Sequence, residues 1–162
     1  MELLERYLGE AIRDMSKTRV RFCFFGDLSR LSPQLQEEAR IAVERSKQYE
    51  GVQVNFCLNY GGRAEIVRAA RQFAQDCADG KCKPDDLTEE RLSELMYSAG
   101  IPDPELVIRP GGELRTSNFL LWQSAYAEYY FTDVLWPDFG PKELDKAIAA
   151  YRQRNRRFGG AK

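Results

Sequence analysis

The feature of this sequence that most constrains its fold is a regular alternation of helix-like and strand-like segments. Apolar residues recur at helical spacing over residues 2–15, and a short strand-like run follows at 19–25. Ser32 and Pro33 then predict a helix start, because serine caps helices and proline suits the first helical position. This order of elements is typical of an α/β fold with a parallel sheet.

The rest of the chain continues the alternation, without an internal repeat or a low-complexity linker. We therefore expect the 162 residues (1–162) to form a single domain. The further elements that we expect are a strand over 52–58, a helix over 63–78, a helix from Thr88 to Gly100, a strand over 105–108, an aromatic block over 118–139 and a helix that begins at Pro141.

Composition excludes several kinds of site. The chain has no histidine, which excludes serine–histidine and cysteine–histidine catalytic pairs and imidazole metal ligands. Its 24 basic and 25 acidic residues give a net charge of −1, so we expect no nucleic-acid partner. No apolar run is long enough to span a membrane, and the acidic N-terminus is unlike a secretion signal. We therefore expect a cytoplasmic protein with at most peripheral membrane association.

The cysteine spacing indicates no metal site. The chain has four cysteines, at positions that match neither a zinc knuckle nor a redox pair. We expect reduced thiols that pack as small apolar side chains. These residues are Cys23, Cys57, Cys77 and Cys82.

Polar, glycine-containing turns follow the expected strands, at the sheet edge where parallel sheets bind ligands. The stretch 109–118 combines two arginines, two hydroxyls and a Gly-Gly pair. Arginine forks suit phosphate oxygens, glycines let backbone amides approach, and a helix starting near Ser117 would add free N–H groups. The stretch therefore indicates a phosphate or diphosphate site, with a polar turn and surface arginines as the alternative. The turn at 59–63 is a weaker case, whose alternative places Arg63 and Glu65 on the surface.

The block at 118–139 is unusually aromatic, and Glu128 is its only charge before Asp133. A lone carboxylate in apolar surroundings needs an arginine, a metal or water as a partner. Aromatic stripes of this kind belong to a core or to a subunit interface. The arginine-rich end at 152–157 is either a second anion-binding patch or a solvated helix end.

Taken in order, these blocks resemble the cis-prenyltransferases, the undecaprenyl diphosphate synthase (isoprenyl transferase) family. The resemblance covers nearly the whole chain and rests on residues 26–27, 59–63, 106–123, 125–128, 131–139 and 156–160. It implies an α/β, parallel-sheet fold like that of undecaprenyl diphosphate synthase. It also implies a transferase that condenses isopentenyl diphosphate onto an allylic prenyl diphosphate. The product would be a polyprenyl, undecaprenyl-type diphosphate lipid carrier.

The resemblance further implies roles for individual residues. Glu128 would be a ligand of Mg²⁺, and the aromatic block at 118–139 would largely form a homodimer interface. Contacts to isopentenyl diphosphate would come from Arg109, Arg115, Ser117, Arg157 and Gly159, the last two reaching across that interface. Assisting roles would fall to Asn59, Gly61, Gly62, Arg63, Glu65 and Glu113.

The sequence departs from the family pattern at its beginning. The family starts with a strand and an Asp-Gly-Asn-Gly-Arg loop that supplies the catalytic aspartate and holds the allylic diphosphate, and residues 1–162 contain neither. The resemblance therefore implies that the first strands are missing, that the chain is the C-terminal two-thirds of the domain, and that it holds no catalytic residue of its own. We expect the chain alone not to elongate prenyl chains.

Three explanations stay open. The chain is a fragment or a misassigned start of a synthase, or it is a non-catalytic accessory subunit of a prenyltransferase dimer, or it is an unrelated α/β phosphate-binding module. The long ordered match disfavours the third. The first is favoured because an accessory subunit has no evident need for the set Arg109, Glu113, Arg115, Ser117 and Glu128.

Overall fold

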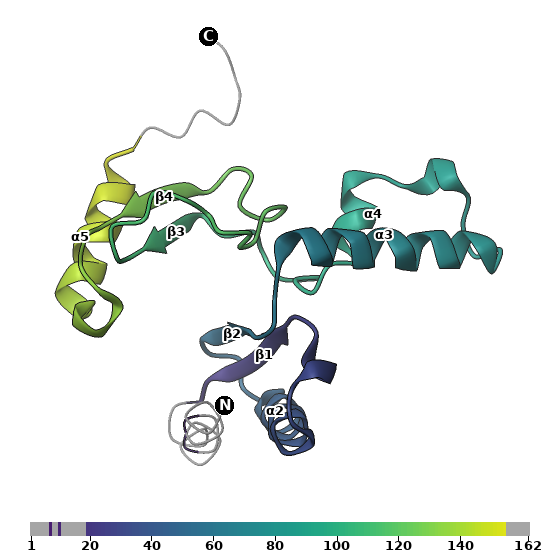
Figure 1. Cartoon of the computed structure of the whole chain (residues 1–162), viewed down its shortest axis with the longest axis horizontal. Helices are drawn as coiled ribbons and strands as arrows, with labels where there is room; N and C mark the ends of the chain where they lie inside the picture. The colour runs from purple at the N-terminus through teal and green to yellow at the C-terminus, as the bar shows by residue number, and fades with distance from the viewer. Residues whose placement is uncertain (1–6, 8–9, 11–18, 155–162) are drawn as a thin grey trace, which may run out of the picture. The chain divides into compact units, whose positions relative to one another are not determined.

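Parallel strand pairing occurs twice along the chain, once in each of the units Met1–Ala99 and Gly100–Lys162 (Figure 1). The computed structural model describes residues 7, 10 and 19–154. Apart from Tyr7 and Glu10, the helix expected over 2–15 lies outside the described residues. Within the part of the chain that is described, no helix has both the length and the apolar character needed to cross a membrane.

In the first unit, β1 (Arg21–Phe25) pairs in parallel with β2 (Gln53–Cys57). The register runs from Arg21 opposite Gln53 to Phe25 opposite Cys57. The helix α2 (Pro33–Ser46) connects the two strands, after the short 3₁₀ turn η1 (Leu28–Arg30). The Ser32 side chain accepts a hydrogen bond from the Leu35 backbone N–H at 3.3 Å, which confirms the predicted cap.

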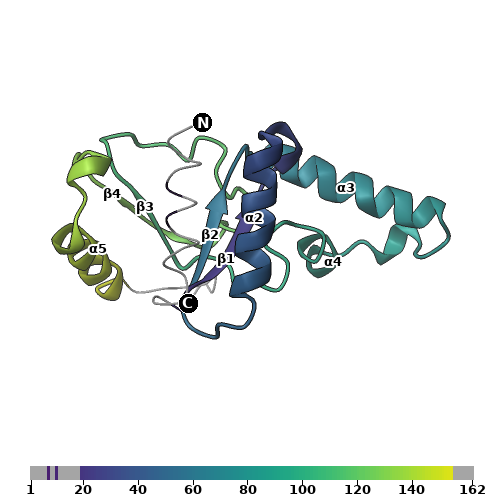
Figure 2. The same ribbon diagram turned by 90° about the horizontal axis from the view of Figure 1, so that it is seen from below.

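The core of this unit lies between α2 and the strands, and Figure 2 shows α2 running along them. Buried residues on α2 recur at three- and four-residue spacing, so one stripe of the helix meets Phe22 of β1. The stripe ends at Ser46, whose hydroxyl accepts a hydrogen bond from the Phe22 backbone N–H at 2.9 Å. The stripe is Leu35, Ala39, Ala42 and Ser46.

The first unit continues with α3 (Gly62–Ala78), the 3₁₀ turn η2 (Pro84–Asp86) and α4 (Glu89–Ser93). Thr88 caps α4 as predicted, since its side chain accepts from the Arg91 backbone N–H at 3.1 Å. The helix expected to reach Gly100 ends earlier, and a series of turns follows Ser93.

In the second unit, β3 (Leu106–Arg109) pairs in parallel with β4 (Glu128–Phe131), in a register that places Arg109 opposite Phe131. The 3₁₀ turn η3 (Trp136–Asp138) and the helix α5 (Pro141–Arg152) follow. The α/β fold with parallel strands is thereby confirmed, and the aromatic block contains a strand that the sequence did not reveal.

The helix expected near Ser117 does not form, which corrects one part of the predicted phosphate site. Turns connect β3 to β4 instead. Three non-glycine residues there adopt positive φ angles, which a right-handed helix excludes: 48° at Ser117, 64° at Asn118 and 44° at Leu120.

Candidate functional site

The turns that follow β1 and β2 lie against each other. The Asp27 backbone N–H donates to the Asn59 carbonyl at 3.3 Å, and the Asn59 side-chain amide donates to the Asp27 carbonyl at 3.0 Å. Gly26 has a φ of +119°, and a Cβ at this position would overlap the Leu58 carbonyl oxygen. These two turns thus share one sheet edge, as predicted, and the approach is close enough to require glycine.

Glu65, on the first turn of α3, is only 1% exposed. Its two carboxylate oxygens accept separate hydrogen bonds, at 2.6 Å from the Tyr60 hydroxyl and at 2.7 Å from the Tyr97 backbone N–H. The surface position considered for Glu65 is therefore wrong. The carboxylate ties the turn after β2 to Tyr97, and its assisting role in binding stays a prediction.

The rest of the 59–63 turn opens α3. Gly61 is the N-cap residue in an extended conformation, and its carbonyl accepts from the Glu65 backbone N–H at 2.9 Å. Gly62 is buried, and Arg63 is exposed at the helix start. At the end of β2, burial and then the Glu65 charge raise the pKa of the Cys57 thiol to about 11.

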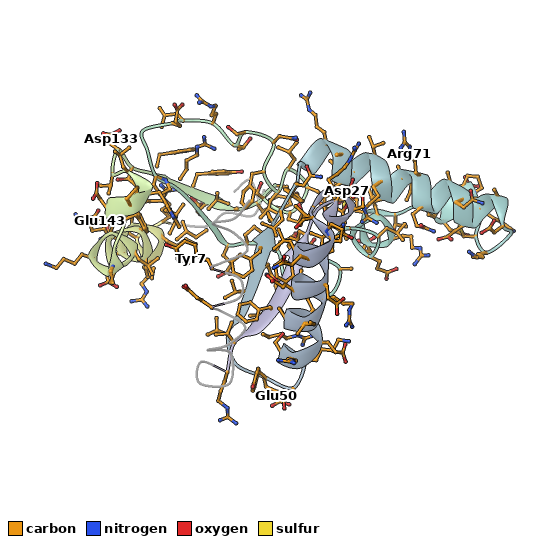
Figure 3. The ribbon with its side chains drawn as sticks, turned by 60° about the horizontal axis from the view of Figure 1, so that its bottom comes forward. Tyr7, Asp27, Glu50, Arg71, Asp133 and Glu143 are labelled. Atoms are coloured by element: carbon orange, nitrogen blue, oxygen red, sulfur yellow. The ribbon has the colours of Figure 1, made fainter. Side chains whose placement is uncertain are left out.

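In the second unit, the loop after β3 is bonded to the segment after β4. The Gly111 backbone N–H donates to the Val134 carbonyl and the Gly112 N–H donates to the Thr132 carbonyl, both at 2.9 Å. Figure 3 labels Asp133 on this segment, and a Cβ on Gly112 would lie 3.1 Å from an Asp133 carboxylate oxygen. Both amides are engaged within the protein, which corrects the expectation that they approach a phosphate.

A cavity of about 290 Å³ lies at this end of the β3–β4 sheet. Arg109 and Arg115 line it, and Arg115 forms an ion pair with Glu113. The remaining walls are mostly apolar and aromatic, so the cavity combines cationic and apolar surfaces. They are formed by Val107, Ile108, Pro110, Thr116, Phe119, Tyr129, Phe131 and Trp136.

Thr116, one of the two hydroxyls noted in the 109–118 stretch, lines the cavity, and the β4 aromatics are cavity residues that the sequence did not single out. Tyr129 and Phe131 lie two positions apart on one strand, so they share a face, and their rings stack 5.8 Å apart. The two-residue spacing of Tyr129 and Phe131 could have indicated a shared strand face, but the uninterrupted aromatic run around them hides the alternation. The exposed Ser117 is on the same loop and does not line the cavity.

Glu128, the expected Mg²⁺ ligand, begins β4 and lies opposite Leu106, the first residue of β3. Arg109 ends β3 three residues later, which separates the two backbone positions by about 10 Å along the sheet. The Glu128 carboxylate accepts a hydrogen bond from Arg154 at 2.5 Å. The sequence left an arginine, a metal or water open as the partner of Glu128, and in the structure the partner is an arginine.

The described residues do not by themselves fit Mg²⁺. Among them, no group of three acidic or cysteine side chains is arranged to hold a metal ion. The one expected ligand is paired with Arg154 instead. The Mg²⁺ assignment stays a prediction, as do the roles of Arg157 and Gly159, which lie outside the described residues.

The family model described as "Putative undecaprenyl diphosphate synthase" matches residues 1–159. An isoprenyl transferase of Clostridium perfringens is 43% identical over 162 residues, which are 100% of this chain and 64% of that protein. An isoprenyl transferase of Fusobacterium nucleatum is 46% identical, with 100% of this chain and 67% of that protein covered. The chain thus spans about two thirds of the length of these curated relatives.

Solved structures are similar over nearly all of this chain. A lavandulyl diphosphate synthase from Lavandula x intermedia, in complex with dimethylallyl diphosphate, has a TM-score of 0.94 and 37% identity. The similarity covers 98% of this chain and 69% of that one. A probable undecaprenyl diphosphate synthase from Campylobacter jejuni has a TM-score of 0.85 and 38% identity, covering 98% and 72%.

Proposed function

Because this chain belongs to the undecaprenyl diphosphate synthase family, we propose that it is the isopentenyl diphosphate-binding part of an isoprenyl transferase. The complete enzyme condenses isopentenyl diphosphate onto an allylic prenyl diphosphate and forms a polyprenyl, undecaprenyl-type diphosphate. Residues 1–162 supply the site for the substrate that is added, and the allylic site belongs to other residues. The curated relatives named above carry the name of this enzyme class.

The observation that carries the proposal is the mixed lining of the cavity beside β3 and β4. Isopentenyl diphosphate has a small branched hydrocarbon and a highly charged diphosphate, so its site needs both kinds of surface. Arg109 and Arg115 supply two guanidinium groups, which suit the oxygens of a diphosphate. Phe119, Tyr129 and Phe131 supply apolar wall for the hydrocarbon.

Glu113 has a defined place in this proposal. Its carboxylate pairs with Arg115, and the two side chains are 44% and 61% exposed. An exposed pair of this kind is weak, so an incoming diphosphate can replace the carboxylate at the guanidinium. Glu113 thus keeps Arg115 beside the cavity, and the pair can separate when a diphosphate binds to Arg115.

The remaining parts of the proposal rest on the family resemblance. They are Mg²⁺ with Glu128 as one ligand, a homodimer through the 118–139 block, and a cytoplasmic enzyme with at most peripheral membrane association. Exposed aromatic side chains in that block, such as Tyr126 at 75% exposure, support the interface. No catalytic step is assigned to Mg²⁺, because the described residues do not form its site alone.

The direct test is isothermal titration of the 162-residue chain with isopentenyl diphosphate and with inorganic diphosphate. Arg109→Ala and Arg115→Ala should each weaken binding of both ligands by about 10- to 100-fold, since each removes a charge-assisted contact. Arg45→Ala, which removes an exposed arginine of α2 in the first unit, is the matched control and should leave binding unchanged.

If all three variants bind both ligands with equal affinity, the cavity is not the isopentenyl diphosphate site. The accessory-subunit alternative predicts a different result. In that case the chain would raise the activity of a complete isoprenyl transferase without binding isopentenyl diphosphate itself.

A further inference from the structure

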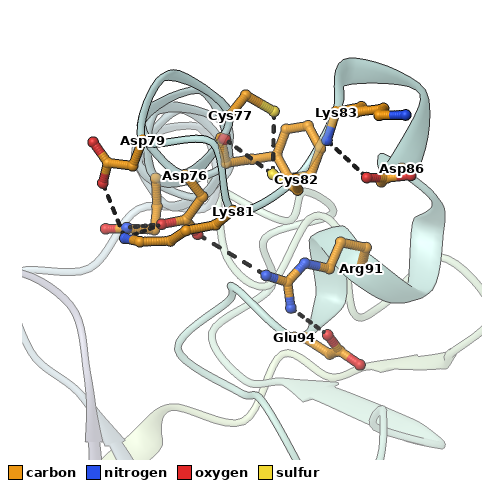
Figure 4. A network of polar contacts seen from close by, with 11 residues as sticks. Asp76, Cys77, Asp79, Lys81, Cys82, Lys83, Asp86, Arg91 and Glu94 are labelled. Carbon is orange, nitrogen blue, oxygen red and sulfur yellow. Dashed lines mark hydrogen bonds and ion pairs between the residues drawn. The ribbon is translucent and has the colours of Figure 1, made fainter.

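The C-terminus of α3 carries a compact chain reversal that brings two cysteines together (Figure 4). The Gly80 N–H donates to the Cys77 carbonyl at 3.0 Å and the Lys81 N–H donates to the Asp76 carbonyl at 2.9 Å. With Gly80 at a φ of +73°, this is the Schellman arrangement that closes a helix end. The reversal folds residue 82 back beside the last turn of the helix.

As a result, the sulfur atoms of Cys77 and Cys82 lie 3.2 Å apart. Both residues are half-buried, so part of their surface is exposed to solvent. The Cys82 sulfur also lies 3.9 Å from the Phe73 carbonyl oxygen, one helical turn before Cys77. Cys23 and Cys57 lie on β1 and β2 instead, and in the described part of the chain the one thiol–thiol contact recorded is that of Cys77 with Cys82.

Ion pairs and hydrogen bonds on both sides of the thiols fix this geometry. The Lys81 ammonium contacts Asp76 at 3.1 Å and Asp79 at 2.9 Å, which holds the reversal onto the helix. The Lys83 backbone N–H donates to the Asp86 carboxylate at 2.7 Å, which holds the segment after Cys82. The two sulfurs are therefore held near each other by contacts that do not involve them.

We propose that Cys77 and Cys82 are a dithiol modification site, which a low-molecular-weight disulfide oxidises to an intramolecular disulfide. The proposal is independent of the isopentenyl diphosphate site, which lies in the other unit. It replaces the expectation that all four cysteines act only as small apolar side chains.

The reaction balances as a thiol–disulfide exchange. One protein thiol loses its proton and attacks the small disulfide, forming a mixed disulfide and releasing one small thiol. The second protein thiol then loses its proton and attacks the protein-bound sulfur, forming the Cys77–Cys82 bond and releasing the second small thiol. The two protein thiols are oxidised by two electrons, and the small disulfide is reduced to two thiols.

The charges around the pair indicate which thiol attacks first. Burial, the Cys82 sulfur and the carboxylates of Asp86 and Asp76 raise the pKa of Cys77 to about 11, whereas the guanidinium of Arg91 interacts electrostatically with Cys82. A thiol with a raised pKa is a poor initial nucleophile at neutral pH. Cys82 therefore attacks the small disulfide, and Cys77, held beside it, completes the bond.

The test incubates the full chain with excess oxidised glutathione, blocks the remaining thiols with N-ethylmaleimide, and digests it with trypsin without reduction. Trypsin cuts after Lys81, between the two cysteines, and after Arg71 and Arg91. Residues 72–81 and 82–91 therefore become separate peptides that only a Cys77–Cys82 disulfide can hold together. We expect this linked pair as the main oxidised product, with Cys23 and Cys57 alkylated.

Variants separate the pair from general thiol reactivity. Cys77→Ser should trap a glutathione adduct on Cys82, because the thiol that resolves it is absent. Cys23→Ser is the matched control and should still give the linked peptides. Glutathione adducts on the unmodified sequence without linked peptides, or alkylation of all four thiols, would each overturn the proposal.

Discussion

At the scale of single residues, two glutamates differ in how far burial removes their carboxylates from solvent. Glu65 has both oxygens hydrogen-bonded inside the first unit, with its side chain removed from water. Glu128 is 28% exposed, and its partner Arg154 is 41% exposed. A charge that is already satisfied in the interior stabilises the fold, whereas an accessible carboxylate with one exchangeable partner can take a ligand.

Replacement of Glu65 by alanine should strongly destabilise the first unit. The change leaves the Tyr60 hydroxyl and the Tyr97 N–H without their acceptor in a buried site. We expect the free energy of unfolding to fall by about 2–4 kcal/mol, measured by urea denaturation. Glu44→Ala, on the exposed face of α2, is the control and should change it little. A Glu65→Ala protein as stable as the control would show that the buried hydrogen bonds contribute nothing.

At the scale of elements, local signals predicted the parts of the fold that local chemistry determines. The Ser32 and Thr88 caps, the strands at 19–25 and 52–58 and the start of α5 are of this kind. The strand β4 was not predicted, because it lies in an uninterrupted aromatic run that shows no alternation of apolar and polar residues. The burial of Glu65 was not predicted because one of its partners, Tyr97, lies 32 residues further along the chain.

The candidate site was predicted only in part, because local sequence patterns reveal some of its residues and not their contacts with distant segments. Arg109 and Arg115 were identified because arginines beside a Gly-Gly turn are a local pattern, and both line the cavity. The availability of the Gly111 and Gly112 amides was predicted wrongly, because their acceptors lie in a distant segment that no local pattern reveals.

The junction of β1 and β2 should depend on the absence of a side chain at Gly26. Gly26→Ala would place a methyl group on the Leu58 carbonyl, so we expect the free energy of unfolding to fall by more than about 3 kcal/mol. Gly80→Ala is the matched control. Gly80 also has a positive φ, but no atom lies within 4 Å of a Cβ there, so its cost should be about 1 kcal/mol. Equal losses by chemical denaturation would assign the whole effect of Gly26 to its backbone angle.

At the scale of the whole molecule, five of the exposed large apolar side chains in the described part of the chain lie between residues 118 and 139. Between residues 118 and 139, Tyr126 and Trp136 are each 75% exposed and Leu135 is 60% exposed. Large apolar groups concentrated in one segment indicate a surface that another protein covers. The homodimer proposed above, with this block as its interface, would bury them.

The dimer can be tested at Tyr126, which does not line the cavity. We expect the unmodified chain to sediment as a dimer and Tyr126→Glu to sediment mostly as a monomer, because the change puts a charge into an apolar interface. Val52→Glu, at a residue of the first unit that is 70% exposed, should leave the dimer intact. If sedimentation velocity gives the same association state for both variants, the 118–139 block is not the dimer interface.

The bonding of Gly111 and Gly112 to the segment after β4 has a consequence for how an anion is held. With these two amides occupied, the proposed attraction of an anion to this loop would come from the guanidinium groups of the half-buried Arg109 and the exposed Arg115. Dissolved salt screens such charges over about 10 Å at 0.1 M ionic strength, while it leaves the contact of a hydrocarbon with an aromatic wall intact. Added salt would thus weaken the binding of the charged end of such a ligand, whereas the binding of its hydrocarbon end would depend on the release of water from apolar surface.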